Sequence, residues 1–134
     1  MNNTGTIINN KGNRKCRVQG GSSNTVGAIY AGRCKKHDVI SVGQAGGLVH
    51  IRFNGHRSDV RLRPYRTELD AHFNNHGCDF DTDLEVTILE QVTGSVHLRE
   101  YKEDVWMTRL NTIHPHGLNK LVREYGHVYK ALFS

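Results

Sequence analysis

Arg52, His56 and Glu103 carry the side chains whose types and positions point most directly to chemistry. Arg52 and His56 are four residues apart, so a helix over 48–60 would place them together at the border of its apolar stripe. Glu103 begins a second apolar helical stripe, which ends at Leu110. A carboxylate that faces a core costs on the order of several kcal/mol unless a cation, a metal or a cleft accompanies it. A metal site would meet this need, and so would a plain Arg52–Glu103 salt bridge or an exposed edge position.

Five short motifs follow one another along the chain in a recognisable order. They are Gly27-Ala-Ile-Tyr30, Ser41-Val-Gly43-Gln44, Leu48-x3-Arg52-x3-His56, Glu103-Asp-Val-Trp106 and Pro115-His-Gly-Leu-Asn119. This order resembles the GIY-YIG endonuclease family, whose pattern runs from a first Tyr through Tyr-Ile-Gly to an Arg, a His, a metal-binding Glu and a late Asn. The resemblance spans roughly residues 25–119. Further phrases are similar, more narrowly, to the endonuclease domain of Penelope-like retroelements: Arg52-Phe-Asn-Gly-His-Arg-Ser-Asp59, His72-Phe73 and Leu110-Asn-Thr112.

The resemblance implies metal-dependent cleavage of one strand of DNA. Arg52 would hold the phosphate with its guanidinium, and Glu103 would bind one Mg²⁺ or Mn²⁺ ion. Tyr30 would accept or relay a proton from the attacking water, provided that Arg52 and the metal lower the phenol pKa from about 10. His56 would orient or share that proton, and Asn119 would brace the site by hydrogen bonds. The alternatives are a core aromatic residue at Tyr30 and a cap or turn residue at Asn119.

Ser41 departs from the family pattern, because it stands where the second tyrosine is expected. Ala45 likewise stands where a threonine is expected. Serine keeps a hydroxyl group but lacks the ring that would reach the phosphate. Loss of one positioning group in catalysis costs about 10²–10⁴-fold in rate. A catalytically decayed DNA-binding module of the same fold is therefore the alternative to an active nuclease.

Cysteine and histidine residues form a second candidate metal site. Cys34-x2-His37 lies in a short turn, and His72-x3-His76 with Cys78 follows the second predicted helix, at spacings that a tetrahedral structural zinc can use. The resemblance to Penelope-like endonucleases implies such a site, and Cys34, His37 and His72 match it best. Cys78 is favoured over His76 as the fourth ligand because thiolate binds zinc more tightly. The alternatives are loop residues without metal, or a zinc-stabilised interaction domain with no role in nucleic-acid binding.

The basic residues are suited to a polyanionic partner. The net charge is +5 and the sequence pI is about 9.3. The resemblance implies DNA as the partner, and a reverse transcriptase domain in a longer polyprotein as a second one. A solvated surface is the alternative explanation for the residues that we predict to contact DNA phosphates, which are Lys35, Lys36, Arg57, Arg61, Arg63 and Arg66.

The hydrophobic periodicity predicts a mixed domain of the α/β (α+β) type, in which helices flank a small, mainly antiparallel three-stranded sheet. Gly46-Gly47 is expected to end the second strand, and a polar turn is expected over 74–83. A final amphipathic segment covers the C-terminal tail. The expected strands are 25–31, 39–43 and 83–90, and the expected helices are 48–60, 67–73, 95–111 and a last one from about 121.

Length and composition limit the size of the core and the classes of protein to which this chain can belong. A chain of 134 residues with 37% hydrophobic content forms one modest core, and it contains no apolar run long enough to span a membrane. We expect residues 1–24 to be a disordered or linker-like basic leader, 25–119 to be the endonuclease-like domain, and 120–134 to be a tail. With three cysteines and no apolar leader, disulfides are not expected, and the compartment is expected to be reducing and nuclear.

Overall fold

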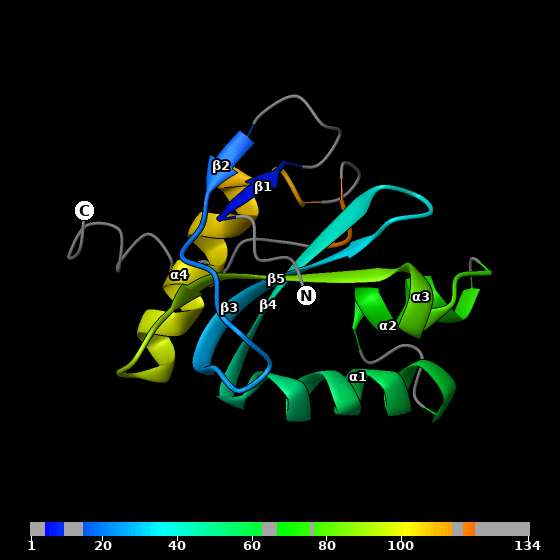
Figure 1. Cartoon of the computed structure of the whole chain (residues 1–134), viewed down its shortest axis with the longest axis horizontal. Helices are drawn as coiled ribbons and strands as arrows, with labels where there is room; N and C mark the ends of the chain where they lie inside the picture. The colour runs from blue at the N-terminus through cyan, green and yellow to red at the C-terminus, as the bar shows by residue number, and fades with distance from the viewer. Residues whose placement is uncertain (1–4, 10–14, 63–66, 76, 114–116, 120–134) are drawn as a thin grey trace.

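The centre of the molecule is a small antiparallel sheet. The computed structural model describes residues 5–9, 15–62, 67–75, 77–113 and 117–119. Three strands pair in the order β4-β3-β5, both neighbours of β3 being antiparallel to it (Figure 1). The predicted fold class, helices flanking an antiparallel three-stranded sheet, is confirmed. The bounds of these strands are Val26–Cys34 for β3, Val39–Leu48 for β4 and Leu84–Gln91 for β5.

The middle strand, β3, is covered on both faces. Every residue from Gly27 to Gly32 is buried, and successive side chains point to opposite sides of the sheet. Ile29 and Ala31 belong to one apolar cluster, while Tyr30 and Cys34 belong to the other. The alternation therefore places Tyr30 and Cys34 on the same face, four residues apart.

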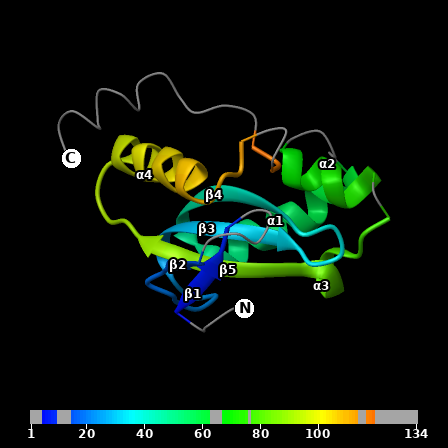
Figure 2. The same ribbon diagram turned by 90° about the horizontal axis from the view of Figure 1, so that it is seen from above.

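Different helices cover the two faces of the sheet. α1 (Val49–Leu62) and α2 (Glu68–Asn75) pack on the face that carries Tyr30, whereas α4 (Val96–Arg109) packs on the opposite one (Figures 1 and 2). The helices predicted over 48–60, 67–73 and 95–111 are confirmed, with ends that differ by one or two residues. A short helix, α3 (Phe80–Asp83), stands where a polar turn was expected, because the Asp79 side chain accepts hydrogen bonds from two backbone N–H groups of its first turn.

The amino-terminal segment differs from the expected leader. Residues Thr6–Ile8 form β1 and Lys15–Arg17 form β2, which pair antiparallel as a separate small sheet. Ile7 and Cys16, opposite each other in this pair, are 4% and 7% exposed and join the apolar cluster under α4. The prediction of an unstructured leader is thus wrong for the described residues of this segment. Each of these three-residue strands buries only its middle side chain, which is too short a pattern to give a periodic signal in the sequence.

β4 also runs further than expected. Gly46-Gly47 does not end it, and the strand continues to Leu48, where α1 begins without an intervening loop. An edge strand needs fewer side-chain contacts than a central one, so two exposed glycines are tolerated there. The tail predicted over 120–134 lies outside the described residues. Among the described residues, no helix combines the length and apolar character that a membrane span requires.

Candidate active site and candidate metal centre

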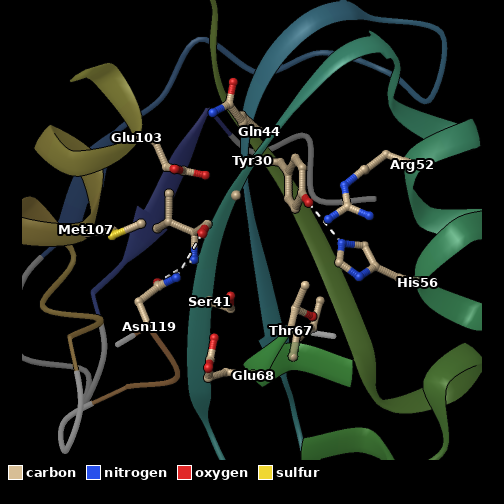
Figure 3. Close-up of a pocket in the computed structure, with 13 residues that line it drawn as sticks. Tyr30, Ser41, Gln44, Arg52, His56, Thr67, Glu68, Glu103, Met107 and Asn119 are labelled. Carbon is tan, nitrogen blue, oxygen red and sulfur yellow. Dashed lines mark hydrogen bonds between the residues drawn. The ribbon is translucent and has the colours of Figure 1, made fainter. Parts of the chain in front are cut away.

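A cavity of about 360 Å³ lies along the edge strand β4 and is lined by residues from both faces of the sheet. β3 and β4 form its floor, α1 and α2 contribute one side, and α4 contributes the other (Figure 3). All six residues that the sequence predicts as catalytic line this cavity. Its labelled lining residues are Tyr30, Ser41, Gln44, Arg52, His56, Thr67, Glu68, Glu103, Met107 and Asn119 (Figure 3).

Arg52 and Glu103 reach the cavity from different helices. Arg52 extends from α1 and Glu103 from α4, and their side chains point into the same space from either side of the Tyr30 ring (Figure 3). Glu103 is only 5% exposed, so the alternative of an exposed edge position is excluded. A guanidinium and a carboxylate in one concave site can together hold an anionic group and a hard cation.

Tyr30 occupies the middle of the site. Its ring packs edge-on against Phe53 at 4.7 Å between centroids, and its hydroxyl oxygen lies 2.9 Å from Nε2 of His56. Burial raises the pKa of the Tyr30 hydroxyl well above its ordinary value; the nearby Arg52 guanidinium lowers it and the Glu103 carboxylate raises it. The sequence led us to expect that Arg52 would help to lower this pKa; Arg52 does so, but burial has the larger effect. Tyr30 is therefore a neutral phenol at neutral pH and needs a proton acceptor in order to act as a base.

Gly43 makes room for the Tyr30 hydroxyl. Gly43 lies opposite Tyr30 in the β3–β4 pair, and a Cβ atom at this position would be 2.6 Å from the hydroxyl oxygen and 2.7 Å from the carbon that bears it. Side-chain carbons do not approach other atoms so closely. Glycine, which has no Cβ atom, therefore fits opposite the Tyr30 ring where a larger residue would not.

The variant Gly43→Ala is expected to displace the Tyr30 ring and to lengthen its contact with His56. Overpacking of this kind costs about 1–3 kcal/mol in the free energy of unfolding. We expect thermal denaturation to show this loss. Gly47→Ala is the control, since Gly47 is exposed in the same strand and a Cβ atom there meets nothing within 4 Å. Equal effects of the two substitutions would contradict this role of Gly43.

Asn119 braces β4 beside the cavity. Its Oδ1 accepts hydrogen bonds from the backbone N–H of Val42 at 2.8 Å and from the Thr112 hydroxyl at 2.7 Å. Its Nδ2 donates to the Val42 carbonyl at 3.0 Å. Asn119 is 9% exposed. Its hydrogen bonds to Val42 fix the segment after α4 to β4. That Asn119 braces an active site stays a prediction.

Ser41 is half-buried on β4, opposite Gly32, and faces the cavity. Its short side chain leaves this part of the floor without an aromatic ring. Thr67 and Glu68, at the start of α2, lie on the same side of the cavity as Ser41 (Figure 3). The end of the cavity near α2 is therefore lined by polar groups together with Leu69.

Asp70 is a polar residue of the site that the sequence analysis did not identify. It is fully buried on α2, and its Oδ1 lies 2.7 Å from Nδ1 of His56. The available sequence signal, Thr67-x-x-Asp70, indicates a helix cap, and the Thr67 hydroxyl does accept a hydrogen bond from the Asp70 backbone N–H at 3.2 Å. That local signal does not reveal the contact with α1.

A second cluster lies at the end of β3, on the sheet face that carries Tyr30. It is formed by Cys34, His37, His72 and Cys78. Their potential ligand atoms all lie within 4.8 Å of one another. The sulfur of Cys78 lies 3.4 Å from that of Cys34, 3.1 Å from Nδ1 of His37 and 3.6 Å from Nε2 of His72. Two thiols and two imidazoles in such proximity suit a tetrahedral metal ion. The other fourth ligand considered, His76, lies outside the described residues.

Desolvation by burial, with the neighbouring Cys34 thiol as the next cause, raises the pKa of Cys78 from 9.0 to about 11. The raised pKa favours the protonated form of this thiol at neutral pH. A metal ion binds thiolate, so metal binding at this cluster releases a proton.

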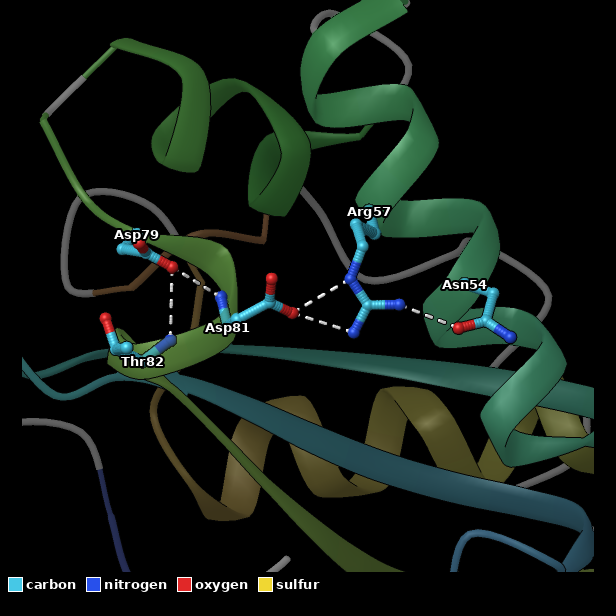
Figure 4. Close-up of polar contacts among 5 residues, drawn as sticks. All are labelled: Asn54, Arg57, Asp79, Asp81 and Thr82. Carbon is cyan, nitrogen blue, oxygen red and sulfur yellow. Dashed lines mark hydrogen bonds and ion pairs between the residues drawn. The ribbon is translucent and has the colours of Figure 1, made fainter.

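The basic residues predicted to contact DNA differ in their surroundings. Lys35, Lys36 and Arg61 are exposed, and Lys36 donates a hydrogen bond to the Gly77 carbonyl at 3.1 Å. The Arg57 guanidinium is engaged with Asp81 at 2.8 Å and with Asn54 at 2.8 Å (Figure 4). A phosphate contact by Arg57 would thus compete with its ion pair to α3. Arg63 and Arg66 lie outside the described residues.

Comparison with known proteins supports the fold. The chain is similar to the catalytic domain of homing endonuclease I-TevI, with 24% identity, a TM-score of 0.56, and coverage of 70% of this chain and 97% of that one. It is also similar to a glutamate-to-alanine mutant of the catalytic domain of intron endonuclease I-TevI, with 24% identity, a TM-score of 0.59, and coverage of 71% and 93%. No protein-family profile and no curated protein matches the sequence. The solved structures show that this chain has the fold of that catalytic domain.

Proposed function

We propose that this protein is a metal-dependent DNA endonuclease that cleaves one strand of a duplex. The observation that carries the proposal is the convergence of Tyr30, Arg52 and Glu103, from three separate elements, in one cavity. The fold is that of an endonuclease catalytic domain, which supports the same reaction class. Phosphodiester hydrolysis needs an anion clamp, a proton acceptor for water and stabilisation of the leaving oxygen, and this donor set is suited to all three.

The roles of the residues follow from their chemistry. Arg52 would hold the non-bridging oxygens of the phosphate, and Tyr30 would take a proton from the attacking water after passing its own to His56. The water oxygen bonds to phosphorus while the bond to the leaving sugar oxygen breaks. That sugar oxygen takes a proton from solvent, and His56 returns its proton to solvent. The Glu103 carboxylate suits Mg²⁺ or Mn²⁺, either of which, when bound, would stabilise the charge on the phosphate and on the leaving oxygen.

We propose a structural zinc ion for the second cluster. Zinc favours two thiolates and two imidazoles in a closed tetrahedral site, and the cluster of Cys34, His37, His72 and Cys78 supplies that set. The cluster joins β3, the β3–β4 turn, α2 and the segment before α3. A metal ion there would hold these elements together in a domain whose hydrophobic content is modest.

Supercoiled plasmid provides the test of the nuclease. With Mg²⁺ or Mn²⁺, the protein is expected to produce relaxed circles, and Glu103→Ala is expected to slow this by about 10²-fold or more through loss of the cation. Glu100→Ala is the matched control, because Glu100 lies on the same helix and does not line the cavity. Nicking that survives Glu103→Ala would contradict the proposal.

The alternative function is a DNA-binding module without catalysis, and Ser41 is the observation that favours it. The cavity lacks a ring at this position, so positioning of the phosphate or of the water is reduced. Retention on DNA that weakens steeply with salt, without nicking under any metal condition, would support this alternative. Nicking that appears only in Ser41→Tyr would identify a nuclease that has lost its activity.

The motifs that are similar to the endonuclease domain of Penelope-like retroelements support a retroelement role. In this role, the protein would act on nuclear DNA. It would lie next to a reverse transcriptase in a longer polyprotein. A nick of this kind leaves a 3′ hydroxyl group that can prime DNA synthesis. Mapping the ends of the nicked strand tests this point: the retroelement role requires a free 3′ hydroxyl that a polymerase extends. Ends that cannot be extended would argue against it.

A further inference from the structure

We propose that Asp70 is a positioning residue that holds His56 in a single tautomer, so that Nε2 of His56 accepts the Tyr30 proton. The inference deepens the proposed nuclease function and rests on it. Asp70, His56 and Tyr30 come from α2, α1 and β3, and form a continuous chain of hydrogen bonds that ends in the cavity.

The geometry of this chain suits a single tautomer of His56. Oδ1 of Asp70 lies 2.7 Å from Nδ1 of His56, and Nε2 of the same ring lies 2.9 Å from the Tyr30 hydroxyl oxygen. An ionised carboxylate only accepts hydrogen bonds, so Nδ1 of His56 must carry the hydrogen that it donates to Asp70. In the neutral ring, Nε2 then presents its lone pair to Tyr30, whose hydroxyl donates.

The surroundings of Tyr30 make such an acceptor necessary. The hydroxyl group is buried beneath the cavity, and burial keeps it in the neutral form. When the proton moves to Nε2, an imidazolium ion forms in a site from which water is largely excluded, since His56 is only 2% exposed. The adjacent carboxylate of Asp70 offsets that positive charge, and it does not need to accept the proton itself.

A purely structural role would not explain the burial of this carboxylate. Asp70 is 0% exposed, and its Oδ2 atom accepts no hydrogen bond from any residue that the structure describes. Its neighbours Leu69 and Phe73 belong to the apolar core. An apolar side chain of similar size would join α1 to α2 without the desolvation cost of an ionised group. Residues that break the rules of packing in this way concentrate at functional sites.

The position of Asp70 in its helix gives a second argument. In a capping box, the side chain of the third helical residue turns back to the N–H of the cap residue. Asp70 is the third residue of α2 and Thr67 caps it, but the Asp70 carboxylate is directed to His56 on the neighbouring helix.

Nitrogen-15 NMR of the histidine rings tests the proposal in the full chain. At about pH 8, above the ordinary histidine pKa, wild-type His56 is expected to show hydrogen on Nδ1 and a free Nε2. In Asp70→Asn, the amide can donate to Nδ1, so the Nε2–H tautomer is expected to appear. Asp81→Asn is the matched control, since Asp81 is an exposed carboxylate on α3, and it is expected to leave the His56 tautomer unchanged.

Single-strand nicking supplies the catalytic readout. Asp70→Asn is expected to lower kcat by about 10²–10⁴-fold at an unchanged KM for DNA, because the group affects the proton and not the phosphate. Thermal denaturation, and comparison of the NMR spectrum of the variant with that of the wild-type protein, separate this effect from misfolding. Hydrogen on Nε2 of wild-type His56, or unchanged kcat in a variant with a shifted tautomer, would overturn the proposal. A wild-type protein that has the expected tautomer but nicks no DNA would refute the nuclease and retain Asp70 as the group that orients His56.

Discussion

Replacement of Tyr30 by phenylalanine is expected to reduce the rate of DNA nicking by about 10²–10⁴-fold, the range that one proton-transfer group contributes. The substitution keeps the ring that packs on Phe53 and removes only the oxygen that contacts His56. The protein should therefore stay folded and should still bind DNA through its basic residues. Single-turnover nicking under saturating enzyme measures the chemical step apart from binding.

Tyr101→Phe is the control for this substitution. Tyr101 is a buried tyrosine on α4, 8% exposed, and its side chain does not line the cavity. Its replacement is expected to leave the single-turnover rate within a few-fold of the wild-type value. If Tyr30→Phe nicks DNA as fast as Tyr101→Phe, then the phenol takes no part in proton transfer and another group must activate the water.

Removal of the proposed zinc ion from the Cys/His cluster is expected to have the largest effect on stability. A ligand present at a thousand times its Kd contributes about 4 kcal/mol to the free energy of unfolding. For a domain of this size, that contribution corresponds to a fall in Tm of about 10 °C or more. A zinc-selective chelator and the variant Cys34→Ser should each produce this fall, measured by thermal denaturation with metal analysis of the same samples.

The same treatment should also slow nicking when Mg²⁺ is supplied afresh. His72 in the cluster and Asp70 beside His56 are two residues apart on α2, so loosening of this short helix affects both sites. Cys16→Ser is the control, because Cys16 is buried in the other apolar cluster and lies outside the metal ligands. It should keep its bound metal and its sensitivity to the chelator. A wild-type protein purified without bound metal, with a Tm that the chelator does not change, would contradict a structural zinc site.

Arg52, His56 and Glu103 could be singled out because each breaks a local pattern, and their catalytic roles were predicted from the resemblance to the GIY-YIG family. Arg52 and His56 are polar residues at the border of an apolar helix stripe, and Glu103 is a carboxylate at the head of another. Such positions cost free energy unless a function requires them, which makes them visible in a single sequence. The structure places all three on one cavity, together with Tyr30 from the central strand.

Asp70 could not be predicted, because the reason for its burial lies in another helix. Its partner His56 is fourteen residues earlier in the chain, and no periodicity links the two. Locally, the carboxylate near the start of α2 has the position of an ordinary helix-capping residue. The β1–β2 pair was missed for a similar reason: Ile7 and Cys16 are buried in an apolar cluster whose other members, from the sheet and α4, lie far away in the sequence.

Paramagnetic broadening by Mn²⁺ would locate the catalytic cation directly. In the zinc-loaded protein with a short DNA duplex, the first amide signals to broaden are expected to be those around the cavity, such as Tyr30, Gly43 and Asn119. The broadening should disappear from these residues in Glu103→Ala. Broadening that starts at the acidic residues around α3, or that is unchanged by Glu103→Ala, would show that Arg52 and Glu103 do not share a metal-dependent site.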